Sequence, residues 1–256
     1  MNGEIQQISN IVIGARKALY DNSDIEFDPG EYVLSIKFLF APKFKFCKPI
    51  EADSVCDWFR LCKERFLEDI KFLVSTDTSH KHLLGFSNTS RSVIACFWKK
   101  GRVSYFLPTW VFDRDNNGWK VVYCEQLAKK HQNEKPLFSN QTEAFKSILL
   151  DIGKFAADVG FPGFSDIFHV AYEALCDCAH MEDDNISAPL PHDFKGIYYA
   201  VDKADVFGAM GSWTDSPPFY AHQKGLEREY NELSDRLLTQ LRLNLMYVVN
   251  ECWKKD

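Results

Sequence analysis

Oxygen-bearing side chains gather in the stretch Asp113–Gly118, which reads Asp-Arg-Asp-Asn-Asn-Gly. They occupy positions one, three and five, and glycine occupies position six, which is the spacing that opens a calcium-binding loop. Calcium takes six or more oxygen ligands, and position twelve, where a glutamate usually closes the loop, is Cys124. Asn and Gly are also typical of hairpin turns. Two interpretations therefore stay open for Asp113, Asp115 and Asn117, a calcium site and a polar turn.

A second group of possible metal ligands follows at steps of four, three and four residues: His169, Glu173, Cys176 and His180. On a helix they share one face, and imidazole, thiolate and carboxylate all bind zinc. The group spans ~16 Å of helix, so at most a neighbouring pair could reach one ion. A polar helix shoulder explains the same residues. We therefore predict no metal and no other cofactor, and His169, Cys176 and His180 remain the alternative ligand set.

Nucleophilic catalysis has no specific signature in the sequence. The chain contains no Gly-x-Ser-x-Gly elbow, phosphate loop or zinc-protease helix. A Cys–His pair is possible in any chain with eight Cys and seven His, and nothing singles out one pair. The sequence thus favours a protein that is not an enzyme. The alternative is an enzyme of unknown class, such as a hydrolase with a site at the sheet edge, which a pocket with a titratable pair would favour.

The stretch from Asp205 to Asp215 combines glycines three residues apart with a large ring, Trp213. Glycine permits a tight backbone, and an exposed tryptophan is a favoured interface anchor. The alternative is that Trp213 packs under the last helix, because large rings usually bury themselves. We predict a partner-binding role for Asp205, Trp213 and Asp215.

An acidic loop at 181–193 adds three further partner-binding candidates, Glu182, Asp183 and Asp184. The whole chain has a formal charge of −6 and a pI near 5.7. This charge disfavours general nucleic-acid binding, which relies on cationic contacts to phosphate, and it suits electrostatic steering towards a basic protein.

Basic and aromatic residues alternate at 43–46, Lys-Phe-Lys-Phe, a combination that can bind single-stranded nucleic acid. On a strand, however, alternation places the rings and the lysines on opposite faces, and lysines are typical of edge strands. We therefore predict no nucleic-acid partner.

The run 208–215, Gly-Ala-Met-Gly-Ser-Trp-Thr-Asp, and the Tyr- and Leu-rich helix after it resemble the C-terminal ends of uncharacterised bacterial immunity-type proteins. The resemblance covers about 45 residues, and no functional residue is carried over from it. It implies a binding protein that neutralises a bacterial toxin by occluding its active site. With the acidic charge, it predicts a basic toxin as the protein partner and leaves the oligomeric state open.

A cytoplasmic location is expected because the N-terminus does not resemble a signal peptide and the scattered cysteines suit reduced thiols. We expect no membrane association, because no apolar run approaches the ~20 residues that span a bilayer.

Periodicity and turn signals place the elements that must position these residues. Strands are predicted at 32–40, 83–86, 92–98, 103–112, 119–124 and 196–201. Helices are predicted at 4–20, 54–74, 165–180 and 226–253, and a further helix begins with a capping box at Asn140–Glu143 and ends at Gly160. The short turns make the strands from 83 to 124 a central meander. The predicted fold class is α+β: an antiparallel sheet of about five or six strands, covered by helices that include a long C-terminal helix. The absence of a Gly-, Ser- or Pro-rich linker favours a single domain over residues 1–256.

Overall fold

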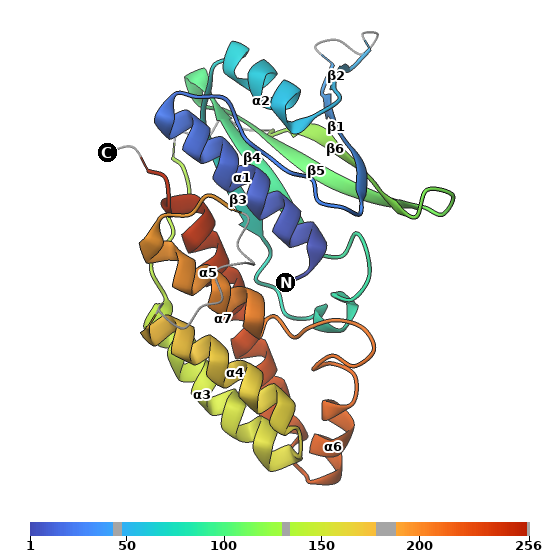
Figure 1. The fold of residues 1–256 in the computed structure, drawn as a ribbon, viewed down its shortest axis with the longest axis vertical. Coiled ribbons are helices and arrows are strands. Elements are labelled where there is room, and N and C mark those ends of the chain that lie inside the picture. Colours follow the sequence, from blue (N-terminus) through green and yellow to red (C-terminus); the bar gives the residue numbers. More distant parts are fainter. Residues whose placement is uncertain (43–47, 130–133, 178–187, 255–256) are drawn as a thin grey trace. The chain divides into compact units, whose positions relative to one another are not determined.

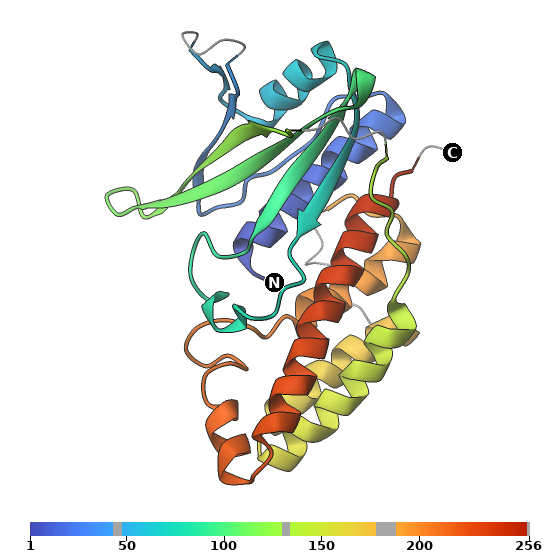
Figure 2. The same ribbon diagram turned by 180° about the vertical axis from the view of Figure 1, so that it is seen from behind.

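The structure is a computed structural model that describes residues 1–42, 48–129, 134–177 and 188–254. The chain divides into two compact units, seen from opposite sides in Figures 1 and 2. The helical unit comprises residues 1–3, 75–90 and 138–252, and the sheet unit comprises residues 4–74, 91–137 and 253–256. The prediction of a single α+β domain over residues 1–256 stays a prediction.

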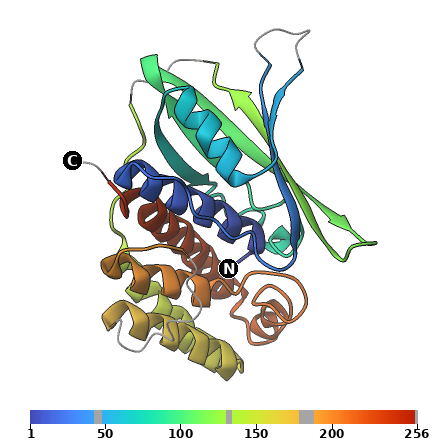
Figure 3. The ribbon, with the colours of Figure 1, turned by 45° about the horizontal axis from the view of Figure 1, so that its top comes forward.

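Six strands in the order β2-β1-β6-β5-β4-β3 form the sheet (Figure 3). Their bounds are Val33–Phe40 (β1), Ile50–Ala52 (β2), Leu67–Val74 (β3), Ser92–Trp98 (β4), Arg102–Asp113 (β5) and Gly118–Leu127 (β6). A short 3-10 turn, η2 (Lys99–Gly101), joins β4 to β5. Strands β3 to β6 are an antiparallel meander, so the predicted strands at 92–98, 103–112 and 119–124 are confirmed.

Strand β1 makes the sheet mixed. It pairs antiparallel with β2 but parallel with β6, where Ile36 lies opposite Val121 and Phe38 opposite Tyr123. The predicted α+β class, strand number and meander are confirmed, but the expectation of a purely antiparallel sheet is wrong. Parallel neighbours need a long connection, here the whole chain between β1 and β6, so no local turn signal reveals their pairing.

Helices α1 (Gly3–Asp21) and α2 (Val55–Glu64) cover one face of the sheet (Figures 1 and 3). The ring of Phe38 stacks on Trp58 of α2 and on Tyr123 of β6, with centroids 4.5 Å and 4.7 Å apart. The Tyr123 hydroxyl donates to Oε1 of Gln7 in α1 at 2.7 Å. Buried rings and this hydrogen bond thus hold both helices on the sheet, and the predicted helix at 4–20 is confirmed.

The predicted helix at 54–74 is wrong beyond Glu64. Its start is confirmed, because the Ser54 hydroxyl accepts from the Asp57 amide at 3.0 Å. The helix ends before Phe66, whose φ of 63° is left-handed, and the chain then enters β3. Ile70 and Phe72 are buried with the period of two that a strand requires, although the apolar residues also happen to follow helical spacing.

The helical unit contains α3 (Thr142–Val159), α4 (Pro162–Cys176), α5 (His192–Ala204), α6 (Pro217–Gln223) and α7 (Glu227–Glu251). The helical hairpin and the long last helix are confirmed. Gly160 ends α3 with a left-handed φ of 97°. Helix α4 begins with Pro162 rather than at Ser165, because proline suits a first helical position.

Two predicted strands are wrong. Leu83 ends a 3-10 helix, η1 (Lys81–Leu83), and residues 84–86 form a turn after it. Residues 196–201 lie inside α5. Burial of Ile197, Ala200 and Ala204 follows a helical spacing of three and four. Short apolar runs do not distinguish a strand from a buried helix. No helix in the described ranges combines the length and hydrophobicity needed to cross a bilayer.

Candidate functional site

The loop 205–215 of the helical unit folds on itself through its own backbone. The Trp213 amide donates to the Val206 carbonyl at 3.0 Å, and the Thr214 hydroxyl donates to the Gly208 carbonyl at 3.1 Å. Gly211 adopts a left-handed φ of 80°, and its amide donates to the Asp215 carboxylate at 2.9 Å. The two glycines therefore permit a compact loop, and one carboxylate oxygen of Asp215 closes it by accepting the hydrogen bond from Gly211.

Trp213 is fully buried, so its ring has no surface to offer a partner. Its indole nitrogen donates to the Ser234 hydroxyl of α7 at 2.8 Å. The rings of Phe164, Phe168 and Tyr230 surround it at centroid distances of 5.2 to 5.6 Å. This placement matches the alternative interpretation, in which Trp213 packs under the last helix.

The Tyr230 hydroxyl closes the same cluster by donating to the Trp213 carbonyl at 2.9 Å. Burial raises the pKa of Tyr230 to about 12, because the charged phenolate is disfavoured away from water. Tyr230 therefore stays a neutral donor that fixes the loop to α7.

The loop 205–215 adjoins the turn after η1, and both segments have exposed hydrophobic side chains. Gly85 of that turn lies so close to the loop 205–215 that a β-carbon on it would meet the Ala209 amide nitrogen at 2.3 Å. The side chains of Met210 and Phe86, which extend from these two adjoining loops, are 95% and 60% exposed. Phe219 and Tyr220 of α6 are also exposed. We call these four side chains the loop surface: Phe86, Met210, Phe219 and Tyr220.

A hollow of about 330 Å³ in the helical unit includes residues next to the loop surface. Thr214 and Pro218 line it, with Lys81 and Asp235, whose side chains form an ion pair at 2.6 Å. Thr214 belongs to the loop 205–215, and Pro218 belongs to α6. A recess that holds polar and charged groups therefore adjoins the elements that present the loop surface.

The acidic charge of the chain is concentrated in the helical unit. That unit has 19 acidic and 9 basic residues, a formal charge of −10, whereas the sheet unit has 17 acidic and 21 basic residues, a formal charge of +4. Glu182, Asp183 and Asp184 belong to the acidic count but lie outside the described residues. Asp205 is half-buried and acts electrostatically on Arg242, whose pKa is lowered by burial and raised in part by this carboxylate.

The calcium-like stretch is a hairpin turn between β5 and β6. The Asp113 carboxylate accepts from the Asp115 and Asn116 amides at 3.1 and 3.2 Å and pairs with the Lys120 ammonium. The Lys120 hydrogen bond is the largest cause of the strongly lowered pKa of Asp113. At Gly118 a β-carbon would meet the Leu34 side chain at 2.7 Å. Close packing against β1 therefore explains the glycine at position six.

His169, Glu173 and Cys176, which belong to the alternative zinc-ligand set, lie on an exposed face of α4. His169 contacts Glu173 at 3.2 Å, Cys176 is exposed, and His180 lies outside the described residues. Among the residues that the structure describes, no three His, Cys, Asp or Glu side chains gather closely enough to hold a metal ion.

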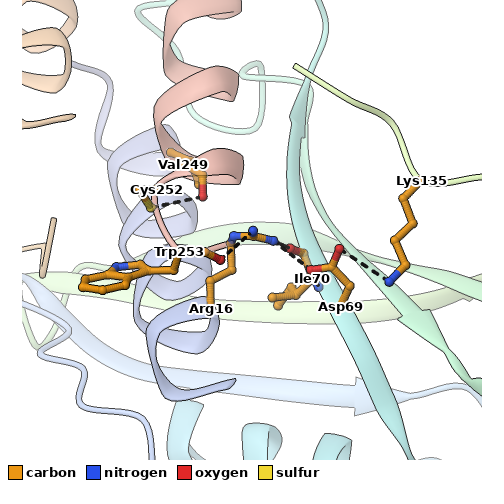
Figure 4. Close-up of polar contacts among 7 residues, drawn as sticks. All are labelled: Arg16, Asp69, Ile70, Lys135, Val249, Cys252 and Trp253. Atoms are coloured by element: carbon orange, nitrogen blue, oxygen red, sulfur yellow. Dashed lines mark hydrogen bonds and ion pairs between the residues drawn. The ribbon is translucent and has the colours of Figure 1, made fainter. Parts of the chain in front are cut away.

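The sheet edge carries a second candidate site, which sequence reasoning missed. Arg16 of α1 is 4% exposed, and its guanidinium donates to the Asp69 carboxylate at 2.7 Å and to the Ile70 carbonyl at 2.9 Å (Figure 4). It also donates to the Trp253 carbonyl at 2.8 Å. Lys135 approaches the other Asp69 oxygen at 3.7 Å. Arg16 thus joins three segments that are distant in sequence, and Lys135 adds a fourth segment through Asp69.

A hollow of about 240 Å³ opens beside this network at the edge strand β3. Four basic and two acidic residues line it, with two aromatic and two leucine side chains: Arg16, Lys71, Lys135, Lys254, Glu68, Asp69, Tyr20, Trp253, Leu19 and Leu137. This lining, within the described part of the chain, includes no Ser, Cys or His. It therefore suits the binding of a charged group better than nucleophilic catalysis.

Comparison of the chain with protein-family models, with curated proteins and with solved structures gives no match. The fold and the sites thus define an α+β protein with two candidate binding surfaces, one in each unit.

Proposed function

We propose that this protein is a cytoplasmic, non-enzymatic binding protein whose helical unit binds a basic protein partner. The observation that carries the proposal is the formal charge of −10 on the helical unit, together with the exposed hydrophobic side chains of the loop surface in the same unit. Complementary charge accelerates association and selects partners. Buried hydrophobic anchors then slow dissociation.

The loop surface has the composition of an interface. Methionine and aromatic residues are enriched at the centres of protein–protein contacts, and Met210 is 95% exposed on a loop that its own hydrogen bonds hold in shape. A preordered loop loses little conformational entropy on binding. Met210, Phe86 and Phe219 therefore replace Trp213 as the proposed anchors, and Asp215 and Glu182 to Asp184 are the proposed steering charges.

The most specific form of the proposal is that the partner is a basic bacterial toxin, which the protein neutralises by covering its active site. The resemblance of residues 208–252 to immunity-type proteins and the acidic helical unit support this form. A partner that acts on nucleic acid would itself carry a basic active site. The acidic surface of the helical unit would then compete with the nucleic acid for that active site.

Site-specific photo-crosslinking tests the proposal. A photoreactive phenylalanine analogue is placed at Met210 or at Phe219, and the protein is irradiated in lysate of its natural source. The matched control carries the analogue at Phe66 of the sheet unit, which is 61% exposed. We expect one basic protein to be captured at both helical-unit positions and not at Phe66. Absence of an adduct at 210 and 219, or equal capture at all three positions, would contradict the proposal.

Reversal of the acidic charges tests the steering. In the variant with Glu182, Asp183 and Asp184 changed to lysine, association with the captured partner is expected to slow at low salt and to converge on the wild-type rate at high salt. An unchanged association rate would remove these three residues from the site.

A further inference from the structure

The sheet-edge hollow presents more positive than negative charge in a partly enclosed space. Arg16 and Lys71 are each 4% exposed, and Lys135 and Lys254 add two further cations, whereas Glu68 and Asp69 supply two carboxylates. One of these carboxylates, Asp69, is already shared between Arg16 and Lys135. Water screens charges poorly in such a recess, so the excess of cations favours an anion there.

The rest of the lining is apolar. The rings of Tyr20 and Trp253 are in tilted contact, with centroids 5.6 Å apart, and Leu19 and Leu137 also line the hollow. Small-molecule sites commonly combine such an apolar wall with a few fixed polar groups. A cavity of roughly 150 Å³ can hold benzene, so the volume of about 240 Å³ is enough for a molecule with one ring.

From these features we infer that the hollow at β3 binds a small organic acid, with its carboxylate or phosphate group towards the lysines and its apolar body against Tyr20 and Trp253. Arg16 positions the site: its three hydrogen bonds fix α1, β3 and the segment after α7 around the recess. This site lies in the sheet unit and is independent of the proposed protein-binding function of the helical unit.

The ligand class is tested by calorimetric titration with three probes of similar size: benzoate, phenyl phosphate and the neutral benzyl alcohol. The indole 15N–1H resonance of Trp253 locates any binding. We expect at least one of the two acids to bind saturably and to shift this resonance, and benzyl alcohol to bind at least tenfold more weakly. The relative affinity of benzoate and phenyl phosphate then distinguishes a carboxylate from a phosphate ligand.

The variant Lys135→Gln/Lys254→Gln removes two cations from the accessible part of the lining. We expect it to weaken binding of the preferred acid at least tenfold, whereas Lys48→Gln, an exposed lysine of the sheet unit outside the hollow, should leave it unchanged. The inference is overturned if neither acid binds at millimolar concentration. It is also overturned if benzyl alcohol binds as well as the acids, or if the double variant binds like the wild type.

Discussion

Replacement of Arg16 by methionine is expected to destabilise the sheet unit far more than the loss of an ordinary surface charge. Arg16 is 4% exposed and makes three hydrogen bonds, to Asp69, Ile70 and Trp253. Methionine keeps much of the apolar stem but none of the donors. The Asp69 carboxylate then loses its closest counter-charge, and two carbonyl oxygens lose their donors.

The expected cost follows from these contacts. Breaking a buried ion pair from one side typically costs about 3–5 kcal/mol, because the remaining charge is left without a partner. Asp69 retains Lys135 at 3.7 Å and its side chain is 21% exposed, so water can compensate in part. We therefore expect a loss near the lower end, about 3 kcal/mol. The variant Arg16→Lys keeps the positive charge but lacks the planar guanidinium, so its loss of stability should lie between those of the wild type and Arg16→Met.

Amide hydrogen exchange of β3 provides the assay, because it reports the opening free energy of this strand even if the two units unfold separately. The matched control is Arg60→Met on α2. Arg60 is 62% exposed and pairs with Asp57 and Glu64, and exposed pairs contribute about 0–1 kcal/mol. A loss for Arg16→Met below about 1 kcal/mol, no larger than for the control, would refute the reasoning.

Three further predictions concern other parts of the chain. Burial raises the pKa of Tyr230 from 10.0 to about 12, so the contribution of Tyr230 to stability is complete below pH 10 and is lost as the pH rises towards 12. Unfolding curves measured between pH 10 and 12 should therefore show a shrinking stability advantage of the wild type over Tyr230→Phe. Gly85→Ala would push a β-carbon to 2.3 Å from the Ala209 nitrogen, so a loss of roughly 1–3 kcal/mol is expected in urea unfolding, and an unperturbed variant would show that the two loops do not touch. Cys62 is fully buried, and its pKa is raised by burial and by the neighbouring Cys96. Peptide mapping after alkylation of the native protein should therefore show slow labelling of Cys62 and fast labelling of the exposed Cys124. Equal labelling rates would contradict the packing of α2 on the sheet.

The sequence predicts the elements whose formation depends on interactions between residues close together in the chain. Glycine and asparagine turns mark the β4–β5 and β5–β6 hairpins, Gly160 marks the end of α3, and the apolar stripe marks α7. The strand β3 is missed because its apolar residues also fit the period of the helix before it. The parallel pairing of β1 with β6 is missed because it depends on contacts more than 80 residues apart, such as Phe38 with Tyr123.

The candidate sites are likewise predictable only where they depend on residues close together in the chain. Sequence reasoning selects the loop 205–215 from its composition, but it cannot tell that Trp213 turns inwards while Met210 turns outwards. The Arg16 network has no sequence signature, because Arg16 and Asp69 are 53 positions apart and the third partner is the carbonyl of Trp253. The only hint in the sequence is that Arg16 follows the apolar run Ile11–Ile13 in the predicted helix, because a buried arginine needs a partner.

The central claim, that the helical unit binds a basic protein, is tested most directly by the crosslinking map. The same photoreactive residue is placed in turn at Met210, Phe219 and Phe66, and adducts are identified by mass spectrometry with and without added salt. The account predicts one basic partner at positions 210 and 219, captured less efficiently at high salt, and no capture of that protein at position 66. Capture only at position 66, or no partner at any position, would contradict it.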